Sequence, residues 1–111
     1  MAHAFRLAAA LAFCLAAVPA HAACYEVQGC TDRAYFSERF LMREGHCDIL
    51  WEIRNRIYKE NGYCFGTSRA IAAFGNAGCR YDDVNAVPLN QYERANVAAI
   101  ARVERLKGCP R

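Results

Sequence analysis

Cysteine and histidine patterns that mark metal and redox centres are missing from this sequence. The chain has seven cysteines, and the closest two are Cys24 and Cys30. Thiolate zinc sites usually draw their ligands from C-x-x-C pairs, and thioredoxin-like redox centres use the same spacing. No two cysteines here are that close. We therefore expect no metal site, no cofactor and no redox activity.

Motifs of hydrolases and of phosphate-binding proteins are missing as well. There is no G-x-S-x-G nucleophile motif and no glycine pattern that cradles a phosphate. Beyond the first 22 residues the single histidine is His46, which we interpret as a surface or capping residue. A cysteine nucleophile would need a free thiolate. We predict no catalytic residues and a protein that is not an enzyme.

The sequence also has no large excess of charge of one sign. Its formal net charge is +3, from 14 basic and 11 acidic residues. Nucleic-acid-binding domains usually carry a strongly basic surface, so we expect no nucleic-acid partner. A small positive charge still allows weak attraction to anionic polymers of the cell envelope.

No apolar run is long enough to cross a membrane as a helix. The run Leu7–Val18 has 12 residues, whereas a bilayer needs roughly 20. A proline and then Ala20-His21-Ala22, a small-x-small cleavage site, follow it, which is the layout of a secretory signal peptide. We predict a signal peptide over 1–22 and an exported protein, periplasmic or extracellular. The alternatives are a buried apolar helix or a lipoprotein anchored at Cys24, although no apolar residue stands three places before that cysteine.

Cleavage after Ala22 leaves one small domain with six cysteines. A core of this size gives little stability by itself, and an even number of cysteines in a short exported chain indicates disulfides. Six cysteines allow many pairings. Four of them lie near the ends of the predicted helices, and Cys24 and Cys30 could close the N-terminal arm on itself. The pairing that we favour is Cys24–Cys30, Cys47–Cys109 and Cys64–Cys79.

Two helices are predicted in the first half of this domain. Ser37 can cap a short helix that ends at Gly45. Over 48–61 the apolar residues recur at helical spacing, and Gly62 can supply the left-handed turn that ends the helix. An Asn-Gly pair also favours a hairpin, but the residues before it do not alternate. The polar segment 24–32 is interpreted as an irregular arm.

Two further helices are predicted in the second half. A capped short helix is expected over 69–74, and 76–88, rich in turn-forming residues, is expected to be a loop. Asn90 with an acid three places later resembles a capping box that starts the last helix. The apolar stripe of that helix ends at Leu106, and Asn96 interrupts it.

The predicted fold class is therefore all-α, a small disulfide-stapled domain of three to four short helices. We divide the chain into a signal peptide (1–22), an N-terminal arm and short helix (23–46) and the main helical domain (47–111). The core is expected to contain Trp51, Ile53, Ile57, Phe65, Phe74, Ile100 and Val103.

The stretch RNRIYKENGYCF, from Arg54 to Phe65, resembles the signature of the YARHG domain, an exported bacterial module. Tyr58 and Gly62 match the first and last letters of that motif. The resemblance spans about 47–109. Its other matching residues are Arg54, Asn55, Ile57, Tyr63, Phe65, Tyr81 and the apolar run 70–74.

The resemblance implies an exported domain, found alone or beside other envelope modules, with no established catalytic activity. The cysteines fit a disulfide-bearing branch of short members. The three middle letters of the motif differ here, and Asn61 stands where the family has histidine. Any chemistry of that histidine would therefore not carry over to this chain.

Two interpretations of the motif residues stay open. In the first they are structural: the aromatic side chains pack around a turn that needs Gly62, and Arg54 and Asn55 bond carbonyls of a helix end or of the loop 76–88. In the second, Tyr58, Tyr63 and Phe65 line a groove that binds a ligand.

A non-enzymatic binding module is the function that the sequence favours, with cell-wall polymer or an envelope protein as its partner. An inhibitor-like role for the braced loop 76–88 is a subclass of this hypothesis. The alternative is a small hydrolase that uses Glu60, Asp82 or Asp83 in a cleft, although adjacent acids in a loop are commonly turn formers. The candidate binding residues are Arg54, Arg69, Arg80, Tyr81, Asp82 and Asp83.

Overall fold

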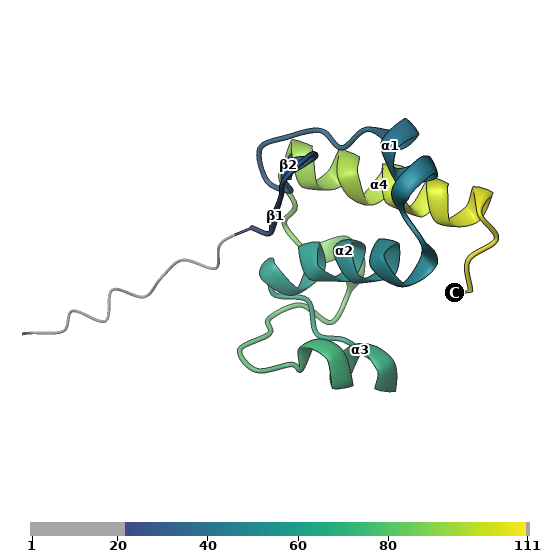
Figure 1. Ribbon diagram of the computed structural model, residues 1–111. Coiled ribbons are helices and arrows are strands. Elements are labelled where there is room, and N and C mark those ends of the chain that lie inside the picture. The colour runs from purple at the N-terminus through teal and green to yellow at the C-terminus, as the bar shows by residue number, and fades with distance from the viewer. Residues whose placement is uncertain (1–21, 111) are drawn as a thin grey trace, which may run out of the picture.

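Four α-helices and one small hairpin make up the part of the chain that the computed structural model describes, residues 22–110 (Figure 1). The predicted all-α class is confirmed. The predicted signal peptide lies outside the described residues, except for Ala22. In chain order the elements are β1 (Cys24–Tyr25), β2 (Gly29–Cys30), α1 (Glu38–Glu44), α2 (Cys47–Glu60), α3 (Ser68–Phe74), the short 3-10 helix η1 (Val84–Ala86) and α4 (Gln91–Leu106).

Side-chain caps fix where three of these helices begin. The Ser37 hydroxyl accepts from the Phe40 N–H at the start of α1, and the Thr67 hydroxyl caps α3 in the same way. Asn90 and Glu93 form a reciprocal capping box at the start of α4. Since each cap satisfies N–H groups that the helix itself cannot satisfy, local sequence defines these boundaries.

The segment 24–32, expected to be irregular, contains an antiparallel hairpin. Cys24 lies opposite Cys30, and Tyr25 lies opposite Gly29. Strands of two residues are too short to show alternation in the sequence, so the pattern could not have revealed them.

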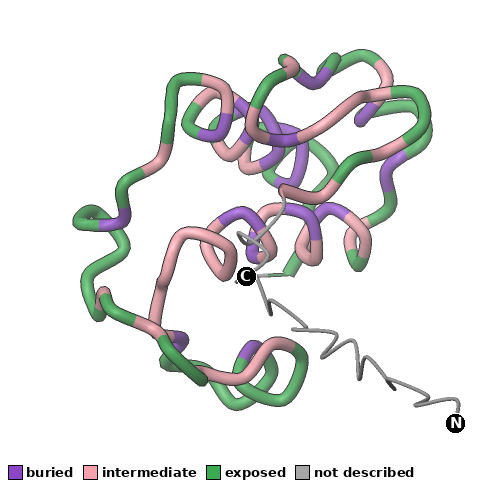
Figure 2. Tube along the Cα trace, turned by 90° about the vertical axis from the view of Figure 1, so that its left-hand side faces the viewer, coloured by how far each residue is buried: buried purple, intermediate pink, exposed green. Residues whose placement is uncertain are grey.

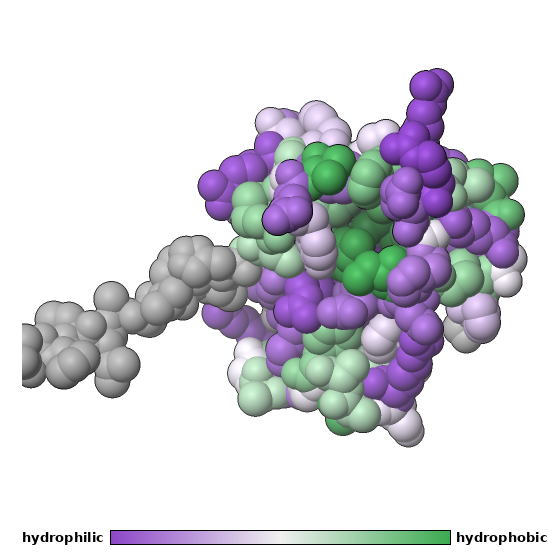
Figure 3. All heavy atoms as spheres, viewed as in Figure 1, coloured by the Kyte–Doolittle hydropathy of each residue, from purple (hydrophilic) through white to green (hydrophobic). Residues whose placement is uncertain are grey.

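The core lies where α1, α2 and α4 meet, and α3 packs on α2 from the other side (Figure 1). Figure 2 shows buried residues concentrated on these three helices, whereas α3 and the following loop are largely exposed. Figure 3 shows a hollow in one face of the molecule, with a hydrophobic floor and hydrophilic edges. The buried core residues are Phe36, Leu41, Leu50, Ile53, Ile57, Ile100 and Val103.

Three of the expected apolar positions differ from the prediction. Trp51 and Phe74 are only partly buried, because α3 covers one side of α2 and leaves the rings at its edge. Leu106, expected in the apolar stripe of the last helix, is 70% exposed because it is the final residue of α4.

Asn96, which seemed only to interrupt the stripe of the last helix, is 1% exposed and holds the N-terminal arm. Its Oδ1 accepts from the Phe36 N–H at 2.8 Å. Its Nδ2 donates to the carbonyls of Thr31 at 3.0 Å and Ala34 at 2.8 Å. One buried side chain therefore satisfies three backbone groups of a segment that has no regular structure of its own.

All three favoured disulfides are present. Cys24–Cys30 closes the hairpin, and Cys47–Cys109 joins the start of α2 to the segment after α4. Cys64–Cys79 joins the two ends of the α3 region. Cys64 and Cys79 lie in the connections on either side of α3, and Cys47 and Cys109 lie at or just beyond the ends of α2 and α4.

Candidate binding groove

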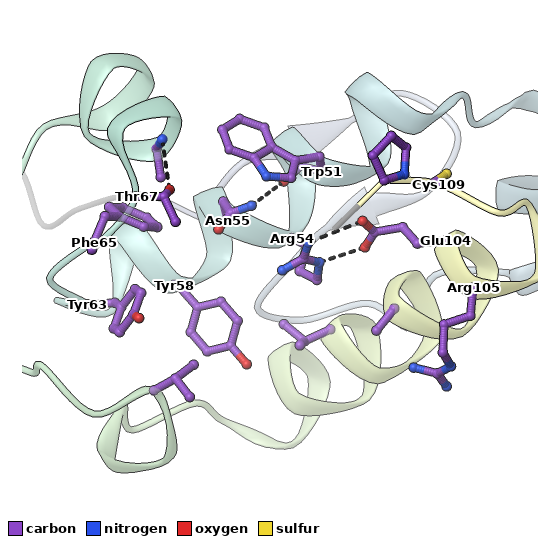
Figure 4. Close-up of a pocket in the computed structure, with 16 residues that line it drawn as sticks. Trp51, Arg54, Asn55, Tyr58, Tyr63, Phe65, Thr67, Glu104, Arg105 and Cys109 are labelled. Carbon is purple, nitrogen blue, oxygen red and sulfur yellow. Dashed lines mark hydrogen bonds and ion pairs between the residues drawn. The ribbon is translucent and has the colours of Figure 1, made fainter.

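An open groove of about 550 Å³ lies between α2, α4 and the segment 63–67 (Figure 4). Four lining residues of α2 recur at the i, i+3, i+4, i+7 spacing that places side chains on one helix face. The lining residues of α4 share a face in the same way. From these two helices the groove receives Trp51, Arg54, Asn55, Tyr58, Val97, Ala101, Glu104 and Arg105.

A chain of neighbouring aromatic rings runs along one side of the groove. Tyr58 lies 5.7 Å from Tyr63, and Tyr63 meets Phe65 edge to face at 5.1 Å between ring centroids. Phe65 stacks on Phe74 at 5.4 Å, and Phe74 lies 5.8 Å from Trp51. Such contacts add to the stability of the packing and hold each ring in a defined orientation.

Arg54 and Glu104 face each other across the groove and form a two-point ion pair (Figure 4). The Arg54 Nε lies 2.6 Å from Oε1, and Nη2 lies 3.1 Å from Oε2. The side chains are 26% and 10% exposed. Because the charges cancel, the centre of the groove is polar but carries little net charge.

Next to this ion pair, burial raises the pKa of the Tyr58 hydroxyl, an effect that the positive charges of Arg54 and Arg94 oppose. The phenol therefore stays protonated at neutral pH and can donate a hydrogen bond.

The turn after α2 depends on Gly62. Its φ is +90°, in the left-handed region, and an added Cβ would lie 3.3 Å from the Tyr81 ring. The Gly62 carbonyl accepts from the N–H groups of Arg80 and Tyr81, and the Tyr81 carbonyl accepts from Cys64. The loop after α3 therefore packs directly on this turn and positions the aromatic segment 63–65.

Comparison with known proteins places this fold in a family. A family model described as the YARHG domain matches residues 25–105, most of the chain. The chain belongs to the YARHG domain family. No curated protein and no solved structure matches it. The match begins at Tyr25, so α1 and all of the hairpin except Cys24 fall within the YARHG domain, beyond the region 47–109 that the motif resemblance covered.

In this YARHG domain the motif residues both pack against one another and line the groove. Of the six that the sequence singled out, Gly62 makes the turn, and the others line the groove. One interpretation expected Arg54 to bond backbone carbonyls, but its side chain pairs with Glu104 instead. Asn55 donates to the Trp51 carbonyl within its own helix at 2.9 Å. The residues brought together are Arg54, Asn55, Tyr58, Tyr63 and Phe65.

The other candidate binding residues do not join this groove. Arg69 lies over the Trp51 ring at 3.9 Å and pairs with Asp48 at 3.2 Å. Arg80 and Tyr81 line a second, smaller hollow beside the end of α2. The arginine and tyrosine side chains expected to form one contact surface are therefore divided between separate places.

The acidic candidates are also spread out. Asp82 and Asp83 are exposed, and Asp83 accepts from the Asn85 N–H at 2.9 Å, so it is a turn former. Glu60 lines the second hollow, and burial raises the pKa of its carboxyl group. It is the single carboxylate among the described residues that line this hollow, so a pair of acids for hydrolysis is not assembled there. His46 is exposed at the start of α2.

Sequence reasoning missed Glu104, the partner of Arg54. A signal was present, because Val97, Ala101 and Glu104 recur at helical spacing beside the apolar stripe of α4. A carboxylate on a half-buried face usually has a cationic partner, but several arginines could have supplied it.

Within residues 22–110, no cluster of three or more His, Cys, Asp and Glu side chains is placed to hold a metal ion. None of the helices there combines the length and apolar character that a membrane span requires. The three disulfides and the YARHG family fit an exported protein.

Proposed function

We propose that this YARHG domain is a non-enzymatic binding module of the cell envelope, and that its groove binds a short stretch of cell-wall polymer through the glycan. The observation that carries the proposal is the position of the motif: five of its residues, from two segments, line one open groove. A motif needed only for the turn would not have to place its side chains there.

The chemistry of the lining suits a sugar chain. Sugar rings present apolar C–H faces edged by hydroxyl groups. Aromatic side chains such as those of Tyr58 and Tyr63 offer a flat apolar surface with a polar end. Asn55 and the ion pair of Arg54 with Glu104 add donors and acceptors that can recognise hydroxyl groups.

The charge of the groove indicates how binding should respond to salt. Glu104 neutralises Arg54, so Arg105 is the remaining charged residue of the lining, and its side chain points away from the pair in Figure 4. Exposed charges lose their effect as salt rises, whereas stacking does not. We expect binding to fall only slightly between low and physiological ionic strength.

The direct test is co-sedimentation of the oxidised protein with isolated cell-wall sacculi over a salt series. We expect saturable pelleting that is weaker by about tenfold in Tyr63→Ala, because a lost aromatic contact of about 1.4 kcal/mol corresponds to that factor. Tyr58→Phe keeps the ring and removes the hydroxyl, so it reports the hydrogen bond alone.

A matched control is Tyr35→Ala. Tyr35 is 61% exposed, lies 4.6 Å from Tyr92 between ring centroids and does not line the groove. Its loss should leave pelleting unchanged. If the wild-type protein fails to pellet even at low salt, the wall is not the partner, and a protein that contacts the loop 76–88 becomes the candidate. Equal losses in Tyr63→Ala and Tyr35→Ala would assign binding to a different surface.

A further inference from the structure

Asn61 and Gly62 form the one Asn-Gly pair in the sequence, and they lie directly after α2. Asparagine is one of the thermolabile residues. The backbone nitrogen of the next residue can attack its side-chain amide carbon, and glycine hinders this attack least because it has no Cβ. An Asn-Gly pair in a flexible chain is therefore a site of spontaneous deamidation.

In the folded protein, hydrogen bonds hold both groups that would react. The Asn61 Nδ2 donates to the Ile57 carbonyl at 2.7 Å and also to the Glu93 carboxylate. The nitrogen that would attack, that of Gly62, donates to the Lys59 carbonyl at 3.2 Å. Because the side-chain amide and the backbone N–H each have partners of their own, cyclisation requires this turn to open first.

The loop after α3 keeps the turn closed. The Gly62 carbonyl accepts from the N–H groups of Arg80 and Tyr81 at 2.7 Å and 3.0 Å. Two residues beyond Gly62, the disulfide Cys64–Cys79 joins the same two segments covalently. The bridge therefore limits how far the turn can separate from the loop when these hydrogen bonds break.

We propose that Asn61 is a modification site: the bridged turn prevents its deamidation, and deamidation of an opened chain prevents the turn from forming again. The Gly62 nitrogen bonds to the Asn61 Cγ, the Cγ–Nδ2 bond breaks, and the proton of the Gly62 N–H leaves with the ammonia. The product is a succinimide ring. A water molecule then opens the ring to aspartate or to isoaspartate, so the reaction needs no oxidant, reductant or enzyme.

The product cannot replace Asn61 in the fold. A carboxylate only accepts hydrogen bonds, so the Ile57 carbonyl and Glu93 would both lose the donor that Asn61 supplies. Glu93 is buried, and a second carboxylate beside it adds repulsion between like charges. The end of α2 would thus lose its link to the start of α4. Deamidation would permanently mark chains in which the turn had failed to close.

The test follows conversion of Asn61 by peptide mass spectrometry during long incubation in mildly alkaline buffer. One variant has alanine at Cys64 and Cys79, and a matched control has alanine at Cys47 and Cys109, a bridge that closes a longer loop at the opposite end of α2. We expect conversion in the first variant to be about tenfold faster than in the wild type, because local opening follows the contacts that hold a segment. An unchanged rate there, or a faster rate in the control variant, would overturn the proposal.

Two further measurements do not depend on how well these variants fold. Reduced wild-type protein in urea should lose the Asn61 amide much faster than the folded, oxidised protein, and equal rates would show that the fold gives no protection. Asn61→Asp should lower the folded-to-unfolded ratio by about tenfold or more, because a hydrogen bond to a charged group is lost. Asn85→Asp, in the exposed 3-10 helix η1, should leave the ratio unchanged. Equal effects of the two substitutions would mean that the product at position 61 does not prevent closure.

Discussion

Arg54 and Glu104 join α2 to α4 through a two-point ion pair at the centre of the groove. Glu104 is buried, so it depends on this arginine for compensation of its charge. A buried charge that loses its partner costs far more than the pair contributes as a whole. The pair is therefore a point where the stability of the fold and the shape of the groove are linked.

Arg54→Ala should lower the free energy of unfolding by about 2–3 kcal/mol, the range for hydrogen bonds to charged groups. Arg54→Lys should recover only part of this loss, because an ammonium group does not reproduce the planar two-point geometry. Urea unfolding of the oxidised protein measures both values.

A double variant and a surface control make this result specific. Arg54→Met with Glu104→Leu should be more stable than Arg54→Ala alone, since neither charge is left unpaired. Arg43→Ala removes an exposed pair with Glu44, and its effect should stay below about 1 kcal/mol. A similar cost for Arg43 and Arg54 would show that burial of the pair has no energetic role.

Asn96→Ala should destabilise the protein by about 3 kcal/mol, because three backbone groups of the arm lose their partner. Asn96→Asp should be no better, since a carboxylate can accept from Phe36 but cannot donate to the two carbonyls. Hydrogen exchange of the Phe36 amide reports the arm directly. If that amide stays protected in Asn96→Ala, the arm is held by other contacts.

Gly62→Ala should cost about 1–3 kcal/mol, because a residue with a Cβ is strained at φ +90° and its Cβ would crowd the Tyr81 ring. The matched control is Gly66→Ala. Gly66 has no positive φ and nothing within 4 Å of an added Cβ. It should be neutral or slightly stabilising. Equal costs at both sites would remove the special role of the turn.

Local signals accounted for most of the fold. Caps such as Ser37 and the Asn90 capping box, and the helical spacing over 48–61, depend on neighbouring residues, and the structure confirms them. The positions of four cysteines near helix ends favoured the pairs Cys47–Cys109 and Cys64–Cys79, and the structure contains both. These features could be predicted because each is determined within a few residues, or by a small number of possible pairs.

The groove was only half visible in the sequence, because its second wall is far away along the chain. The residues of the α2 face were identified through the motif, but Glu104 lies 50 positions from Arg54. Likewise, Asn96 looked like an interruption because its partners, 31–36, have no pattern of their own. Long-range polar contacts between an ordered helix and an irregular segment leave no local periodicity.

The stability of the protein should depend on pH through Glu60. Burial raises its pKa above the ordinary 4.5 in the folded state, so the folded state holds the proton more tightly than the unfolded one. Stability should therefore fall as the pH rises from the ordinary value through the raised one and then level off. Urea midpoints over a pH series measure this, and the fall should be absent from the Glu60→Gln variant.

Two disulfides should differ in whether their loss affects binding at the groove or the stability of the core. Replacing Cys64 and Cys79 by alanine opens a loop of 15 residues and should cost about 3 kcal/mol in the chain-entropy model. Replacing Cys47 and Cys109 opens a loop of 62 residues and should cost about 4 kcal/mol.

The Cys64–Cys79 bridge braces the segment with Tyr63 and Phe65, so its loss should weaken wall binding even where the helices remain folded. Binding and far-UV circular dichroism on the same samples distinguish the two effects. Unchanged binding by the folded protein without the first bridge would mean that hydrogen bonds between the turn at Gly62 and Tyr81 are sufficient to hold the aromatic wall.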